Sequence, residues 1–309
     1  MKTLTLPGVR PDASAVVLGL MRIAPLSDGE IRALVGTARD AGIIMFDHAD
    51  IYGGEPHGAE RRFGDARAVP ASERDQVIIQ SKVGIREGYF DFSREHILTA
   101  VNESLAALKT DYLDTLLLHR PDTLVEPEEV ASAFDQLQAE GKVRAFGVSN
   151  HTPGQIELLK RSVRQPLIAN QVQFSITHAA LVAQGIAANM SGLEQSIDRD
   201  NGILDYSRLH DMTVQAWSPF QRKFFDGVFL GDREQYPELN RVLEEIADKY
   251  GITPTGVAVA WILRHPAEMQ VILGTTNPGR VIDSAAGADT VLTREEWYRL
   301  FRAAGHTVP

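Results

Sequence analysis

The sequence predicts a single (β/α)₈ barrel, and three observations lead to this expectation. Short apolar runs of β type alternate with longer segments of helical period, which is the pattern of βα units and a parallel sheet. Eight such runs can be counted, and a length of 309 residues suits one barrel of this kind. No strand is followed by Gly-x-Gly-x-x-Gly or by a Walker phosphate loop, which disfavours an open nucleotide-binding sheet. We therefore expect residues 1–309 to form one domain.

The expected strands leave room for a helix after each one. They cover residues 15–20, 43–46, 77–82, 113–118, 143–148, 167–172, 212–217 and 270–273. Because strands and helices alternate, the carboxyl ends of all eight strands would open on one mouth, where barrels of this type keep their chemistry.

The helices between the strands are predicted from their starts and stops. The clearest begins after Ser93, its expected N-cap, where apolar residues recur every three to four positions. Other expected starts are the capping-box pairs Ser27/Glu30 and Thr293/Glu296, and Glu126 and Thr253, each followed by proline. Gly42 and Gly141 lie where helices should stop before the next strand.

Two connections are longer than an ordinary βα loop. One covers residues 174–210 and has helical period near residues 178–188, and the other covers residues 219–237 and carries several aromatic residues. Long loops on the active face of a barrel usually serve as lids or substrate walls.

Composition narrows the classes of function. The content of 44% hydrophobic and 23% charged residues is ordinary for a globular protein. The absence of cysteine excludes disulfides, thiolate metal sites and cysteine nucleophiles. A net charge of −10 disfavours nucleic acid as a partner, since phosphate binding requires clustered Lys and Arg. There is no apolar segment of signal or membrane-spanning length, so we expect a cytoplasmic protein without a membrane partner.

Chemically distinctive side chains stand at the ends of successive strands. Asp47 and Tyr52 follow the second strand, Lys82 ends the third, and His119 follows the fourth. An ammonium lowers the pKa of a neighbouring phenol, normally about 10, and a carboxylate holds the ammonium in place. A histidine beside the phenol can hydrogen-bond a substrate oxygen. The set suits protonation of an oxygen that gains negative charge during a reaction.

Each of these residues also has a plainer interpretation. Tyr52 could be a loop tyrosine beside two glycines, His119 a histidine bonded to a carbonyl, and Asp47 a turn cap. Lys82 could be a solvated lysine or the Schiff-base lysine of an aldolase-type barrel. Their positions at consecutive strand ends favour one shared site.

The motifs around these residues resemble the aldo-keto reductase family. They are Phe46-Asp47-His48-Ala49-Asp50-Ile51-Tyr52-Gly53, Ser81-Lys82-Val83-Gly84, Leu117-Leu118-His119-Arg120-Pro121-Asp122, Gly147-Val148-Ser149-Asn150, Asn170-Gln171-Val172-Gln173-Phe174, Ala216-Trp217-Ser218-Pro219 and Ala260-Trp261-Ile262-Leu263-Arg264-His265-Pro266. The likeness follows the family's order over essentially the whole chain. It is strongest to bacterial oxidoreductases in which histidine follows the aspartate.

The resemblance implies reduction of an aldehyde or ketone to an alcohol with NADPH. Tyr52 would be the general acid, and Lys82 and Asp47 would tune it. His119 would orient and polarise the carbonyl. The expected partner is therefore a small-molecule carbonyl compound, bound by a monomer or weak oligomer.

The resemblance also implies a nicotinamide site. Ser149, Asn150 and Gln171 match the positions that hold the carboxamide, which needs both donors and acceptors. Trp217 takes the place of the aromatic residue that stacks on the ring, and Ser218 follows it in the same motif.

The phosphate end of the cofactor is expected at the last strand. A glycine turn, hydroxyl groups and an arginine precede a helix there, at Gly274, Thr275, Thr276, Asn277 and Arg280. Backbone donors at a helix start favour an anion, and a guanidinium can bind phosphate bidentately, which favours NADP over NAD. Asp283 and Ser284 stand where many relatives have Gln or Glu followed by Asn, which leaves the adenine contacts open.

The substrate is not identified by the sequence. Candidate wall residues are Met21, Tyr89, Phe90, Phe224 and Phe225, which favour an apolar or aromatic pocket. No metal is expected, because His48, His57 and His119 lack ligand-like spacing with carboxylates, and a solvated or structural role is expected for His57. Two rival functions are a non-catalytic nucleotide-sensing barrel, as in channel accessory subunits of the family, and a lysine-dependent aldolase.

Overall fold

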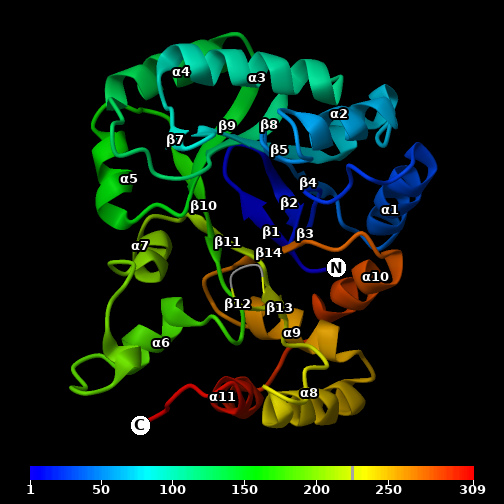
Figure 1. The fold of residues 1–309 in the computed structure, drawn as a ribbon, viewed down its shortest axis with the longest axis vertical. Coiled ribbons are helices and arrows are strands. Elements are labelled where there is room, and N and C mark those ends of the chain that lie inside the picture. Colours follow the sequence, from blue (N-terminus) through cyan, green and yellow to red (C-terminus); the bar gives the residue numbers. More distant parts are fainter. Residues whose placement is uncertain (224–225) are drawn as a thin grey trace.

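The computed structural model describes residues 1–223 and 226–309, and eight parallel strands form a closed barrel within them (Figure 1). The strands are β3 (Val16–Gly19), β4 (Met45–Asp47), β5 (Ile78–Val83), β8 (Leu113–Leu118), β9 (Val143–Ser149), β10 (Leu167–Gln173), β11 (Thr213–Trp217) and β14 (Gln270–Leu273). Each overlaps one of the eight expected runs, so the predicted barrel is confirmed.

The ring closes between its first and last strands. In parallel register, Val16 of β3 pairs with Val271 of β14, and Leu18 pairs with Leu273. On its other side β3 pairs with β4, and the order continues through β5, β8, β9, β10 and β11 back to β14. All eight carboxyl ends therefore face the same mouth.

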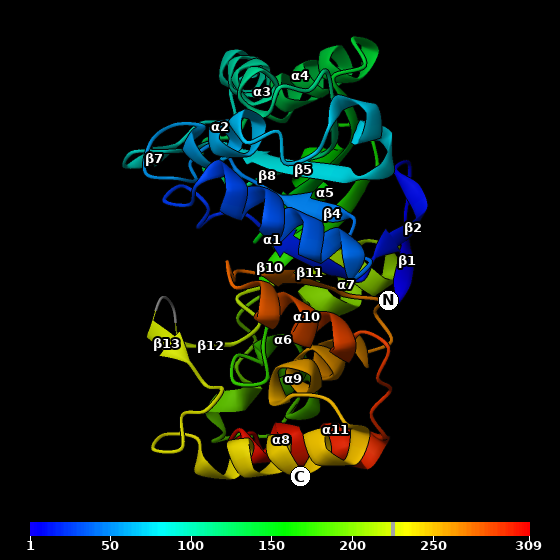
Figure 2. The same ribbon diagram turned by 90° about the vertical axis from the view of Figure 1, so that its right-hand side faces the viewer.

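Helices cover the outside of the ring, as the two views show (Figures 1 and 2). They are α1 (Asp28–Asp40), α2 (Gly58–Asp65), α3 (Arg94–Leu108), α4 (Pro127–Ala139), α5 (Pro153–Lys160), α6 (Ala180–Ile186), α7 (Ile203–Leu209), α8 (Pro237–Tyr250), α9 (Pro254–Leu263), α10 (Pro278–Gly287) and α11 (Arg294–Ala303). Two short 3₁₀ helices cover Ala71–Gln76 and Glu194–Ser196. None of the helices in the described part of the chain is long and apolar enough to cross a membrane.

Most predicted helix boundaries are confirmed by hydrogen bonds. Ser27 and Thr293 each form a complete capping box, and Ser93 and Thr253 accept a backbone N–H at the third helical position. Glu126 also occupies an N-cap position, but its side chain makes no capping bond. The proline that follows it begins α4 without needing a donor partner.

The two glycines expected after helices adopt the predicted conformation. Gly42 follows α1 with φ 82°, and Gly141 follows α4 with φ 70°. A side chain would be strained in this left-handed region, so glycine turns the chain sharply into the next strand.

In the described part of the chain, three antiparallel hairpins lie outside the ring, and the sequence pattern did not predict them. β1 (Thr3–Leu6) and β2 (Arg10–Ser14) lead into the amino end of β3. β6 (Ile85–Arg86) and β7 (Tyr89–Phe90) follow β5, and β12 (Gln221–Lys223) and β13 (Asp226–Val228) follow β11. The long connection over residues 174–210 contains α6 and α7.

Candidate active site

The barrel brings Asp47, Tyr52 and Lys82 into direct contact. Lys82 Nζ donates to Asp47 Oδ2 at 2.6 Å, to Tyr52 Oη at 3.2 Å, and to the carbonyl oxygen of His48 at 2.8 Å. The ammonium is completely buried. These three bonds use all three of its donors, so the amine is fixed between the carboxylate and the phenol.

The fourth residue, His119, lies beside the phenol. Its ring meets the Tyr52 ring edge-on, with centroids 5.8 Å apart and an interplanar angle of 84°. The backbone N–H of His119 donates to the carbonyl oxygen of Val83 at 2.9 Å, which extends the strand pairing by one residue. Its Nδ1 is buried and has no hydrogen-bond partner among the described residues.

The loop that carries Tyr52 is anchored at both ends. The backbone N–H of Tyr52 donates to the Ala49 carbonyl, and the Tyr52 carbonyl accepts from Ala59 N at 2.8 Å. Behind the loop, His57 Nδ1 lies 2.6 Å from Glu60 Oε2. His57 is thus a buried structural residue, in agreement with one of the two roles expected for it.

The pKa of Tyr52 differs from the simplest expectation. Burial raises the pKa of this phenol above its ordinary value, the ammonium of Lys82 opposes that effect, and Asp47 adds to it. The net shift is upward because burial outweighs the effect of the ammonium. The sequence pattern indicates the neighbouring cation but not the depth of burial. The phenol therefore holds its proton at neutral pH, as a proton donor must.

Lys82 and His119 have opposite protonation states at neutral pH. Burial alone would lower the pKa of Lys82, but the charge of Asp47 and the contact with Tyr52 raise it above its ordinary value. Burial, together with the nearby charges of Lys82 and Arg120, lowers the pKa of His119 well below its ordinary value. The site thus combines a charged amine with a neutral imidazole.

Glutamines inside the barrel support Asp47, and the sequence reasoning missed most of them. Asp47 Oδ1 accepts from Gln80 Nε2 at 2.6 Å and from Gln171 Nε2 at 3.0 Å. Gln215 extends this network, donating to Gln80 Oε1 and to Gln270 Oε1. A polar amide within an otherwise apolar strand is the signal that could have identified Gln80, Gln215 and Gln270.

The residues expected around the nicotinamide form one hydrogen-bonded chain. Ser149 Oγ donates to the Gln171 carbonyl at 2.7 Å, and Asn150 Nδ2 donates to Ser149 Oγ at 2.8 Å. Trp217 Nε1 donates to Asn150 Oδ1 at 3.1 Å. Asn150 and Ser218 both have left-handed backbone, with φ 60° and 54°, and such strain in residues other than glycine is frequent at binding sites.

The expected phosphate end lies between β14 and α10. Asn277 caps α10 by accepting the Arg280 N–H at 3.3 Å, and its own N–H donates to Thr275 Oγ1 at 3.1 Å. Arg22, from the loop after β3, donates to the Gly274 carbonyl at 2.6 Å and was not anticipated. Ser284 Oγ bonds back to the Arg280 carbonyl, within its own helix. Thr276 is half-buried in the same loop.

Of the five residues expected to line the substrate pocket, the structure describes three. Tyr89 and Phe90 lie on the β6–β7 hairpin and are 57% and 42% exposed, and Met21 is half-buried in the loop after β3. Phe224 and Phe225 lie outside the described residues. The hairpin after β5 thus presents two aromatic side chains to solvent next to the Lys82 strand.

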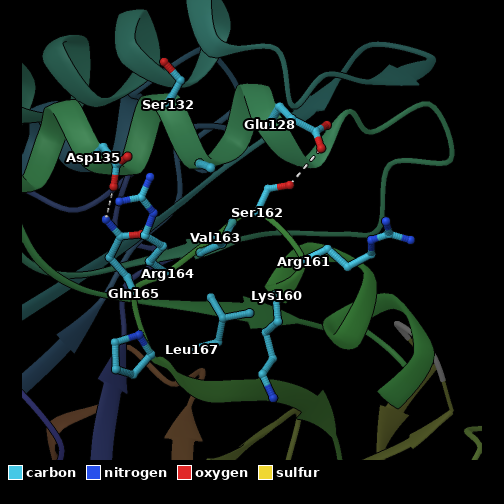
Figure 3. Close-up of a pocket in the computed structure, with 12 residues that line it drawn as sticks. Glu128, Ser132, Asp135, Lys160, Arg161, Ser162, Val163, Arg164, Gln165 and Leu167 are labelled. Atoms are coloured by element: carbon cyan, nitrogen blue, oxygen red, sulfur yellow. Dashed lines mark hydrogen bonds between the residues drawn. The ribbon is translucent and has the colours of Figure 1, made fainter.

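A large hollow on the molecule lies away from this mouth. It has a volume of about 800 Å³ and is lined by α4, the end of α5 and the segment leading into β10 (Figure 3). Its walls combine apolar residues with charged and polar ones, and among the latter Ser162 is bonded to Glu128 and Gln165 to Asp135. None of the expected site residues lines it, so we do not assign the chemistry to it. Within residues 1–223 and 226–309, no three His, Asp or Glu side chains are grouped as metal ligands would be.

Comparisons with known proteins establish the family and agree with this fold. A model of the aldo/keto reductase family matches residues 15–304, so the chain belongs to this family. It is 34% identical to oxidoreductase YdhF of Escherichia coli over 322 residues, covering 100% of both chains. It is 32% identical to the 6-dehydroglucose reductase of Agrobacterium fabrum over 307 residues, covering 95% of each. A solved aldo-keto reductase from Klebsiella pneumoniae in complex with NADPH is 26% identical, with a TM-score of 0.75 over 98% of this chain and 95% of the other. The expected family and fold are confirmed.

Proposed function

We propose that this chain is an NADPH-dependent oxidoreductase that reduces the carbonyl of an aldehyde or ketone to an alcohol. The observation that carries the proposal is the double contact of Lys82 Nζ with Asp47 Oδ2 and Tyr52 Oη. The unit of function is the whole chain, residues 1–309, working in the cytoplasm as a monomer or weak oligomer on a small-molecule substrate.

The residues at the mouth fit a nicotinamide nucleotide. Ser149, Asn150 and Gln171 would hold the carboxamide, with Trp217 against the ring and Ser218 beside it. The Gly274–Asn277 turn and Arg280 would hold the phosphates at the amino end of α10. Arg280 is exposed and forms no ion pair within the described parts of the chain, so its guanidinium is available to a phosphate.

In the proposed reaction the bound cofactor supplies the hydride, and the protein supplies the proton and the orientation. Tyr52 Oη gives its proton to the carbonyl oxygen as that oxygen gains negative charge. Lys82 remains charged beside Tyr52 and stabilises the phenolate left behind. His119, being neutral, donates one N–H to the same carbonyl oxygen and aligns it.

The state of Lys82 also separates this function from an aldolase. A Schiff-base lysine must be uncharged to attack a carbonyl. The raised pKa of Lys82, despite its burial, keeps the amine protonated, so its nitrogen has no lone pair, and its three N–H groups are all engaged in hydrogen bonds. The geometry therefore favours proton transfer over covalent catalysis.

Replacing Tyr52 by phenylalanine tests the proton donor. We expect Tyr52→Phe to lower kcat by about 10²–10⁴-fold, because the general acid is lost while the ring remains. Turnover is measured by NADPH oxidation with a panel of aldehydes, ketones and quinones, and cofactor affinity by NADPH fluorescence, which should change little. Tyr298→Phe on α11 is the matched control and should match wild type. Turnover by Tyr52→Phe at the wild-type rate contradicts the assignment, and undetectable turnover by wild type with tight NADPH binding favours a nucleotide-sensing barrel.

A further inference from the structure

Arg120 carries a positive charge at the mouth that no protein carboxylate balances. It follows His119 directly and is half-buried, with its Cζ 5.9 Å from the Trp217 ring centre. Within residues 1–223 and 226–309 its guanidinium forms no ion pair and no hydrogen bond. The two remaining residues, Phe224 and Phe225, have no charge to offer. A cation held partly out of water without a partner is unfavourable, and a bound anion would relieve it.

Two acidic groups, Asp122 close by in sequence and Asp47 in the candidate site, are already engaged elsewhere. Asp122 Oδ1 accepts from Leu124 N at 2.8 Å, and its Oδ2 accepts from Phe92 N at 3.1 Å. Asp47 is bonded to Lys82. Burial lowers the pKa of Arg120, and among the described residues the influence that opposes this shift comes from the Tyr52 hydroxyl and not from an Asp or Glu. The positive charge therefore remains available.

The guanidinium is close enough to the reaction centre to meet a substrate. Arg120 directly follows His119, and its Cζ lies 5.9 Å from the centre of the Trp217 ring, whose Nε1 is bonded to Asn150. The charge of Arg120 also helps to lower the pKa of His119, which would contact the carbonyl oxygen. A substituent a few bonds from that carbonyl would therefore reach Arg120, with the Trp217 ring on one side of the guanidinium.

We propose that Arg120 is a substrate-binding residue that holds an anionic substituent of the carbonyl compound, a carboxylate or a phosphate. The fork of the guanidinium matches two oxygens of either group. This inference rests on the proposed carbonyl reduction and adds a substrate class to it: aldehydes or ketones with a negatively charged group near the carbonyl.

Two matched pairs of substrates test the assignment with the purified full-length protein and NADPH. Succinic semialdehyde and butanal differ by a carboxylate, and glyceraldehyde 3-phosphate and glyceraldehyde differ by a phosphate. We expect wild type to prefer the charged member of at least one pair. Arg120→Gln should lower kcat/KM for that member by about 10–100-fold, mainly through KM, and change the neutral member by less than about 3-fold. The pair with the larger loss identifies the anion.

Two further variants distinguish the effect of the Arg120 charge from a nonspecific loss of activity. Arg120→Lys keeps the charge but not the fork, so it should recover part of the loss. Arg161→Gln removes one exposed charge at the distant hollow and should behave as wild type. Equal losses for charged and neutral members, or a wild-type preference for the neutral member of both pairs, overturn the anion site while leaving carbonyl reduction intact. Failure of wild type to reduce any of the four compounds, while it reduces other aldehydes or ketones of the panel, also overturns the anion site. Failure with the whole panel would remove the proposed function, and this inference with it.

Discussion

Among single residues, His48 shows how strongly burial can change the pKa of a side chain. Its ring is fully buried, and neither ring nitrogen has a hydrogen-bond partner in the described part of the chain. The ring packs edge-on against Phe63 with centroids 4.8 Å apart, and its backbone carbonyl accepts a bond from Lys82. Burial lowers the pKa of His48 to about 4. Between pH 6.5 and pH 4 the imidazole therefore stays neutral in the folded protein, whereas it is protonated in an unfolded chain.

This histidine should make the protein sensitive to acid. From pH 6.5 down to pH 4 the unfolded chain takes up a proton that the folded chain does not, so the free energy of unfolding falls as pH falls. His48→Leu should reduce that fall by roughly 1–3 kcal/mol between pH 7 and pH 4. Urea titrations of wild type and His48→Leu between pH 7 and pH 4 measure the free energy of unfolding at each pH. Burial also lowers the pKa of His151 and His265 to about 4, so some dependence should remain. An unchanged slope in His48→Leu would contradict the explanation.

Residue positions in the candidate site were predictable, but their environments were not. Strand ends in the sequence indicated that Asp47, Tyr52, Lys82 and His119 would meet, because parallel strands share one carboxyl edge, and in the structure they do. The upward pKa shift of Tyr52 depends on how deeply the folded chain buries it. Local sequence does not contain that information. The roles of the four residues stay proposals until turnover is measured.

Between elements, the most demanding contact is the crossing of α9 and α10. A Cβ added at Gly287 of α10 would overlap the carbonyl oxygen of Gly256 on α9. One added at Gly256 would lie 3.0 Å from the Asp283 carbonyl oxygen. The two backbones therefore touch, and this fixes the position of the helix whose amino end carries Arg280.

A methyl group at this crossing should push the helices apart. We expect Gly287→Ala to lower the free energy of unfolding by about 1–3 kcal/mol, since the atom it meets is backbone and cannot rotate away. Gly36→Ala in α1 is the control, because nothing lies within 4 Å of the added atom. It should stabilise the protein by about 0.5–1 kcal/mol through better helix propensity. Urea denaturation measures both, and a stabilised Gly287→Ala would show that the crossing is looser than described.

Elements with a strong local signal were predicted, and short ones were not. Capping boxes at Ser27 and Thr293 are encoded in four neighbouring residues, so both were found. The β6–β7 and β12–β13 hairpins have strands of two or three residues. Alternation of apolar and polar residues cannot be recognised over so few positions.

For the molecule as a whole, ring closure is the organising feature. Alternation of strands and helices predicts a parallel sheet, and the count of eight predicts that its edges join. The pairing of β3 with β14 joins them across more than 250 residues of chain. The position of the large outer hollow was not predictable, since it depends on how α4 and α5 pack, and the oligomeric state was equally out of reach.

Removing the last strand should therefore abolish the fold. A chain of residues 1–268 lacks β14 together with α10 and α11, and it leaves one edge of β3 and one of β11 unpaired. Such edges invite association with other chains, so we expect an aggregated or unfolded product by gel filtration and circular dichroism. A truncation of Val308 and Pro309 alone serves as the control and should fold. A monomeric 1–268 chain with cooperative unfolding would show that closure is dispensable.

The hairpins beside the mouth pair with themselves and share no strand register with the barrel. Because ring closure does not depend on their pairing, we expect that exchanging either hairpin for that of a relative would change the rim of the mouth while the eight-stranded ring still forms.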